Sequence, residues 1–149
     1  MISSFATFKL EIIEPDDPDD PAGESLLEEL KSAISGFDEA SIDLWRGTGW
    51  SLDLSSTDAC FQIYISLTED NHWYLGISPT GLPSFFQRLF GSKTPNYLPE
   101  LEQLSLTVFD HLNQSGAIGQ QWSINADPTE SEVSSPNELS WSSFDVSNN

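Results

Sequence analysis

The sequence predicts an α+β fold, in which a mostly antiparallel sheet of about five to six strands carries two to three helices on one face of a single domain. Runs of alternating apolar and polar residues predict the strands, and short polar turns between them favour antiparallel neighbours. Two longer segments carry apolar residues at the spacing of an α-helix. Strands and helices do not alternate regularly, which argues against a parallel βαβ sheet.

The first strand is predicted over residues 5–14, where Phe8, Leu10 and Ile12 alternate with charged neighbours. The Asp/Pro-rich stretch EPDDPDDPAGES, residues 14–25, ends that strand because proline cannot donate to a ladder.

A helix is predicted over residues 25–36. Ser25 and Glu28 form a capping box, and Gly36 suits the C′ position. The apolar stripe of this helix is Leu26, Leu27, Leu30, Ala33 and Ile34.

Four strands are predicted next, joined as a meander by short polar turns. They are SIDLW (41–45), WSLDL (50–54), CFQIYISL (60–67) and WYLGIS (73–78). Trp50 and Trp73, together with Trp122 further on, fit inward strand positions. Trp45 and Trp141 fit no apolar stripe, and we expect them to be exposed anchors for a partner if they flank the acidic stretch.

The second half of the chain predicts a short helix, a longer helix and a last strand. The short helix lies in 81–91, the longer one begins at Pro99 and ends before Gly116, and the strand spans 117–125. The stripe of the longer helix is Leu101, Leu104, Val108 and Leu112. The element order is therefore β-α-β-β-β-β-α-α-β.

The composition divides the chain into two parts. Residues 1–126 form the α+β domain, and residues 127–149 form a polar, acidic C-terminal segment. Leu139, Trp141 and Phe144 in that segment predict that it docks on the domain as an extended chain.

The net charge is unusually negative. The chain has 24 acidic and five basic residues, a formal net charge of −19 at pH 7. Such a field disfavours nucleic acid and anionic membranes and favours a basic protein partner. The N-terminus does not have the pattern of a signal peptide, and no run approaches the about 18 apolar residues of a membrane span. We therefore expect a cytoplasmic protein.

Twelve of the acidic residues lie within residues 11–43, beside a single base, Lys31. The segment lacks the ligand order of an EF-hand, and its prolines stiffen it, so a calcium loop is disfavoured. Two interpretations remain level: a solvated loop with glutamates at a helix N-terminus, or an acidic surface that docks a basic protein. The residues predicted to bind the partner are Asp16, Asp17, Asp19, Asp20, Glu24, Glu28, Asp38, Glu39, Asp43 and Trp45.

The sequence does not predict a catalytic site. His72 and His111 are far apart and in no metal-binding spacing, and Cys60 has no basic neighbour to lower its pKa. Arg88 and Lys93 are the one pair of basic residues close together in the sequence. Ion pairs with the protein's own surplus acids explain them more simply than an anion-binding site does. We expect neither an enzyme nor a cofactor or metal site.

In composition alone, the chain resembles the immunity proteins of bacterial competition systems, which are small acidic proteins that neutralise basic toxins. The resemblance implies a non-enzymatic inhibitor that occludes a basic toxin or nuclease, and it assigns no functional residue. Two alternatives stay open. One is a small-molecule-binding domain with a pocket near residues 80–98, and the other is an acidic protein of a high-salt habitat with an unrelated function.

Overall fold

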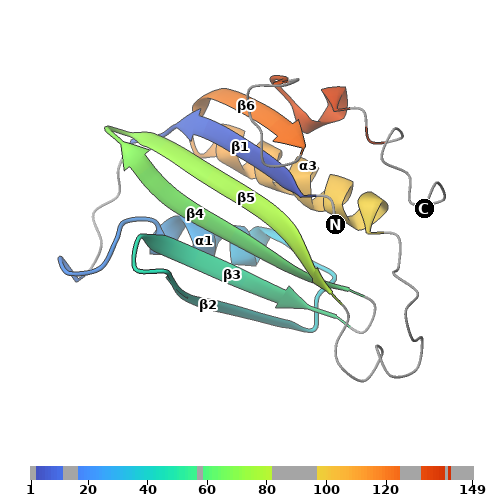
Figure 1. Ribbon diagram of the computed structural model, residues 1–149, viewed down its shortest axis with the longest axis horizontal. Helices are drawn as coiled ribbons and strands as arrows, with labels where there is room; N and C mark the ends of the chain where they lie inside the picture. Colours follow the sequence, from blue (N-terminus) through green and yellow to red (C-terminus); the bar gives the residue numbers. More distant parts are fainter. Residues whose placement is uncertain are drawn as a thin grey trace.

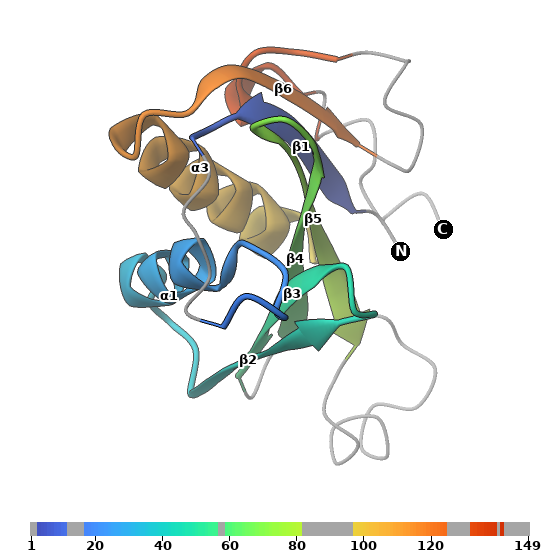
Figure 2. The same ribbon diagram turned by 90° about the vertical axis from the view of Figure 1, so that its left-hand side faces the viewer.

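The computed structural model describes residues 3–11, 17–56, 59–81, 97–124, 132–139 and 141. These residues form a six-stranded antiparallel sheet with two helices packed on one face (Figures 1 and 2), which confirms the predicted fold class. In chain order the elements are β1 (Ser4–Lys9), α1 (Glu24–Ala33), β2 (Glu39–Trp45), β3 (Gly49–Ser55), β4 (Cys60–Glu69), β5 (His72–Gly81), α3 (Leu98–Gln114), β6 (Ile118–Ile124) and the 3-10 helix η1 (Pro136–Glu138).

The strand order across the sheet is β2-β3-β4-β5-β1-β6. The meander β2 to β5 follows the chain, because each hairpin turn is short enough to pair neighbours. β1 lies between β5 and β6, whereas β2 lies at the opposite edge (Figure 1). The segment that joins β1 to β2, including α1, therefore crosses most of the width of the sheet.

The core lies between the sheet and the two helices. Alternation places Leu52, Ile63 and Leu75 on the helix-facing side of three neighbouring strands, and all three are fully buried. Trp50, Trp73 and Trp122 also belong to the core, with exposed fractions of 7%, 3% and 0%, as predicted. The buried stripes of the helices are Leu26, Leu27 and Leu30 on α1, and Leu101, Leu104, Val108 and Leu112 on α3.

The predicted ends of α1 are wrong. The helix begins at Glu24 after Gly23, which has a φ of 123° and makes no side-chain cap, so Ser25 and Glu28 do not form a capping box. A Cβ on Gly23 would lie 2.8 Å from Ile65 Cδ1, and this close approach to the sheet sets where the helix starts. At the other end Ile34 is the C-cap, so Gly36 lies one residue beyond C′, although its φ of 94° still makes it a turn residue. Ala33 is exposed rather than part of the stripe.

The ends of α3 agree with the prediction. Pro99 lies in its first turn, and Gly116, with a φ of 93°, follows the C-cap Ser115. The helix is joined to β1 by a buried hydrogen bond of 2.8 Å between the hydroxyls of Ser105 and Ser4.

The described part of the C-terminal segment lies against β6 and α3. Val133 pairs with Trp122 through two backbone hydrogen bonds, and the side chains of Leu139 and Trp141 are 8% exposed within the core. The burial of Trp141 contradicts our expectation that it is an exposed anchor. The helix predicted in 81–91 and the side chain of Phe144 lie outside the described residues.

Two buried indoles hold the ends of the crossover between β1 and α1. Trp73 Nε1 donates to the Leu10 carbonyl at 3.0 Å, and Trp50 Nε1 donates to the Pro21 carbonyl at 2.8 Å. The acidic stretch between these points is therefore anchored on both sides by neutral hydrogen bonds to the sheet.

We expect Trp50→Phe to lower the free energy of unfolding by about 1–3 kcal/mol, because it removes the donor to Pro21 and leaves a gap beside the core. Limited proteolysis near residues 17–23 should become faster in the same variant. Lys31→Ala, on the exposed face of α1, is the control and should change the unfolding free energy by less than about 0.5 kcal/mol in urea titrations. Equal stability and equal proteolysis in Trp50→Phe and the wild type would show that the indole does not anchor the crossover.

Candidate protein-binding site

The aspartates that precede α1 form a compact turn. The Asp19 amide donates to Asp17 Oδ1 at 2.9 Å, and the Asp20 amide donates to the Asp17 carbonyl at 3.0 Å. The Asp17 side chain therefore supports the local backbone as well as carrying charge. Asp17 and Asp19 are exposed, whereas Asp16 lies outside the described residues.

The glutamates of α1 point away from the sheet. Glu24, in the first turn, and Glu28 are both exposed. Glu29 approaches His111 on α3, with 3.6 Å between Oε2 and Nε2, which is too long for a hydrogen bond. Among the described residues this is the one contact within 4 Å between a carboxylate and a basic side chain, so Glu24 and Glu28 have no basic partner within that part of the chain.

The remaining predicted residues lie on or beside β2. Register with β3 places Ile42 and Leu44 on the helix side of the sheet, opposite the core residues Leu52 and Trp50. Glu39, Asp43 and Trp45 alternate with them and project from the other face. Asp38 is exposed just before the strand.

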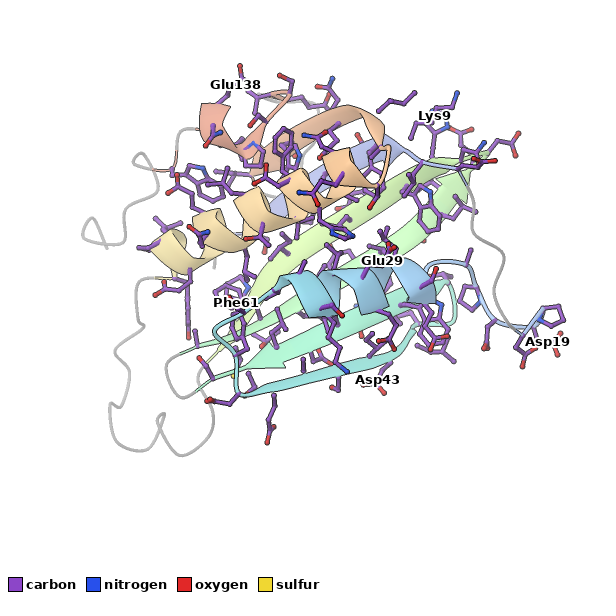
Figure 3. All side chains as sticks on the ribbon, turned by 180° about the vertical axis from the view of Figure 1, so that it is seen from behind. Lys9, Asp19, Glu29, Asp43, Phe61 and Glu138 are labelled. Carbon is purple, nitrogen blue, oxygen red and sulfur yellow. The ribbon has the colours of Figure 1, made fainter. Side chains whose placement is uncertain are left out.

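The predicted binding residues thus lie on two faces of the sheet that meet at β2. Figure 3 shows Asp19 on the loop, Glu29 on α1 and Asp43 on β2, in the half of the molecule opposite Lys9 and Glu138. The structure brings Glu39, Asp43 and Trp45 onto one side of one strand, and places the α1 glutamates on the other side of the sheet. That all of these residues contact one partner stays a prediction.

Figure 2 shows that both helices lie on one face of the sheet. A row of aromatic rings crosses the other face. Trp45 stacks on Tyr64 with centroids 4.5 Å apart, Tyr64 lies 6.0 Å from Tyr74, and Tyr74 lies 5.8 Å from Phe5. Arg46 Cζ lies 5.0 Å from the centroid of Trp45, a cation–π distance. The rings come from β2, β4, β5 and β1, so the row runs from the acidic edge across the sheet to β1, which adjoins the far edge strand β6.

The sequence analysis missed this row. Alternation places Tyr64 on the face opposite the core, and Tyr74 lies on the same face of the next strand, where it pairs with Ser66. The row could not be predicted because it depends on the register of β3 with its two neighbours. Trp45 on β2 contacts Tyr64 on β4 across β3 only when β3 pairs with both strands in the observed register.

Burial dominates the environment of two tyrosines. Burial is the main cause that raises the pKa of Tyr74 well above its ordinary value. A hydrogen bond and a charge interaction with Tyr64 raise this pKa further. Burial, with a smaller contribution from Cys60, also raises the pKa of Tyr97. Both phenols therefore remain neutral at physiological pH and contribute packing rather than charge.

The groups considered for chemistry do not converge within the described residues. His72 Nδ1 lies 2.9 Å from the Asp70 carbonyl in the β4–β5 turn, whereas His111 lies in the last turn of α3. Cys60 is half-buried, with its sulfur 3.6 Å from the Ser55 hydroxyl. In that part of the chain no group of three His, Cys, Asp or Glu side chains is placed to hold a metal, and no helix is long and apolar enough to span a membrane.

One open hollow of about 410 Å3 lies at the tips of β1, β5 and β6. Its polar lining includes Lys9, Glu69 and His72, while Ile118, 63% exposed, forms part of its rim. This hollow is not the pocket predicted near residues 80–98, since residues 82–96 lie outside the described part of the chain, together with Arg88 and Lys93.

Comparison with profiles of protein families, with characterised proteins and with solved structures found no match.

The aromatic row makes a specific stability prediction at Gly76. The Tyr64 ring covers this glycine, so a Cβ there would lie 2.2 Å from Tyr64 Cζ. Because Tyr64 is held between Trp45 and Tyr74, we expect Gly76→Ala to cost about 1–3 kcal/mol in the free energy of unfolding.

The same substitution should be neutral or stabilising in a Tyr64→Ala background, since alanine is favoured over glycine in a strand once the ring is removed. Chemical unfolding of the four proteins in this double-mutant cycle measures the coupling. Equal costs of Gly76→Ala in both backgrounds would mean that the ring does not rest on Gly76.

Proposed function

We propose that this protein is a non-enzymatic binding domain that uses the acidic region of α1, its preceding loop and β2 to occlude a basic partner protein, in the manner of an immunity-type inhibitor of a toxin or nuclease. The proposal includes a cytoplasmic location, where such an inhibitor meets its target. The observation that carries it is the position of β2. This edge strand exposes Glu39 and Asp43 with no described Lys or Arg in ion-pair contact with them.

The basic residues within residues 17–56 do not neutralise these acids. Lys31 lies in the last turn of α1, where a cation suits the negative end of the helix. Arg46 lies over the Trp45 ring in the β2–β3 turn, so its guanidinium is engaged with an aromatic face. A partner that supplies lysine and arginine would gain charge pairs without displacing internal ones.

The arrangement also supports fast association. Exposed acids lie on the loop, on α1 and on β2, and Figure 3 shows one from each: Asp19, Glu29 and Asp43. Such a field steers a basic protein toward these acids and accelerates encounter at low ionic strength. Trp45, beside Asp43, adds an aromatic anchor next to the charges.

The test is a comparison of three immobilised proteins: the wild type, a Glu39→Gln/Asp43→Asn double variant, and a Glu100→Gln/Asp110→Asn double variant. The last pair neutralises two exposed acids on α3 and matches the change in net charge. Each is incubated with lysate of the native cell at low and moderate salt, and retained proteins are identified by mass.

We expect one basic protein to bind the wild type and the α3 variant in stoichiometric amounts and to elute as salt rises. Its affinity for the β2 variant should be about tenfold weaker. Equal retention by all three proteins would contradict the assignment to β2. Retention of no basic protein by any of them would contradict the proposed function.

A further inference from the structure

The two edges of the sheet are built differently. β6 is an irregular strand, since Gly119 has a φ of 66° and the register of β6 with β1 shifts between Thr7 and Lys9. Beyond it, Trp122 and Val133 exchange two backbone hydrogen bonds of 2.6 and 2.9 Å, so the C-terminal segment pairs with this edge at Trp122.

β2 has none of these protections within the described residues. Its pairing with β3 runs without a register shift from Glu39 opposite Ser55 to Trp45 opposite Gly49. The strand, EASIDLW, contains no proline and no lysine, the residues that commonly block strand edges. No described segment pairs with its outer side, so alternate backbone N–H and C=O groups of β2 point away from the sheet.

The side chains along this edge define what fits beside it. Leu44 is 52% exposed on the helix-facing side, next to half-buried Ile42. Asp43 and Glu39 project from the opposite side. A strand laid along β2 therefore meets an apolar row on one side and a negative row on the other.

We propose that β2 binds its partner by strand addition, and that the added strand alternates basic residues, facing Glu39 and Asp43, with apolar residues, facing Ile42 and Leu44. This inference rests on the proposed function and specifies its partner: a basic protein with an extended, alternating segment. Backbone hydrogen bonds supply the pairing, and the two rows of side chains select the sequence.

The charge argues against a second copy of this chain as the occupant. Pairing β2 with β2 of another molecule brings together two chains that each carry −19, with Glu39 and Asp43 of both copies along the same seam. A basic strand instead neutralises this seam.

The probe is a synthetic peptide of about nine residues with capped termini, in which lysine and valine alternate. It is long enough to pair with the whole of β2. The control peptide has the same composition with its lysines and valines in two blocks. Binding is measured by fluorescence anisotropy, and amide hydrogen exchange of the full chain locates the contact.

We expect the alternating peptide to bind at least about tenfold more tightly than the block peptide. Exchange should slow at amides of residues 39–45 and not along α1 or β6.

Leu44→Glu separates strand addition from attraction by charge alone. The substitution adds a negative charge, which strengthens a purely electrostatic contact, but it removes the apolar contact that strand addition uses. We expect it to weaken binding of the alternating peptide by about tenfold. Ile118→Glu is the matched control, because Ile118 is an exposed apolar residue on the opposite edge strand, and we expect no loss there.

The outcomes separate this inference from the proposed function. Equal binding of both peptides, unchanged exchange of β2 amides, or tighter binding by Leu44→Glu would overturn strand addition and leave the acidic binding region standing. Binding of neither peptide at low salt would overturn both. Protection of β2 amides that depends on protein concentration without peptide would show that a second copy occupies the edge, and would also overturn the inference.

Discussion

The crossover from β1 to β2 is the constraint on which the rest of the structure depends. β1 pairs with β5 and β6, but the strand that follows it in the chain begins the meander at the far edge of the sheet. The connecting segment therefore has to cross one face, and α1 contributes Leu26, Leu27 and Leu30 to the core as it does so. The indoles of Trp73 and Trp50 hold the two ends of the acidic loop through the Leu10 and Pro21 carbonyls. One consequence is that the acids of α1 and those of β2 lie near the same edge of the sheet.

Much of the fold could be predicted from the sequence because it follows from local periodicity. Alternation identified the strands and the inward positions of Trp50 and Trp73, and the 3.6-residue stripe identified both described helices. The start of α1 could not be predicted in this way, because it depends on the contact of Gly23 with Ile65, a residue on a strand that comes later in the chain. A capping box is a local signal, and here a tertiary contact overrides it.

The candidate site was predictable in its charge but not in its shape. Counting acids located the region around residues 11–43, whereas only the sheet order shows that β2 is an edge strand and that its acids and those of α1 lie on different faces. The aromatic row depends on register in the same way. Composition therefore located the region, and pairing between distant strands decided which residues share a surface.

The open face of the sheet around Trp45 and the outer edge of β2 differ in the groups that they leave for the proposed partner. On the open face, Trp45 is stacked on Tyr64 and approached by Arg46, so the aromatic rings largely engage one another. The outer edge of β2, in contrast, offers backbone groups and the exposed Leu44 beside Asp43. The Asp17 turn fits the interpretation of a solvated loop, since its carboxylate supports its own backbone. Among the described residues of the proposed binding region, the outer edge of β2 therefore leaves the most groups for a partner.

No described segment pairs with the outer edge of β2, which we propose as the binding edge, and residue-resolved amide hydrogen exchange of the free chain by NMR tests most directly whether this edge is open. We expect alternate amides of residues 39–45 to exchange rapidly, while the Trp122 amide, which donates to Val133 on the opposite edge, exchanges slowly. Uniformly slow exchange along β2, independent of protein concentration, would show that another part of the chain covers this edge and would contradict the account.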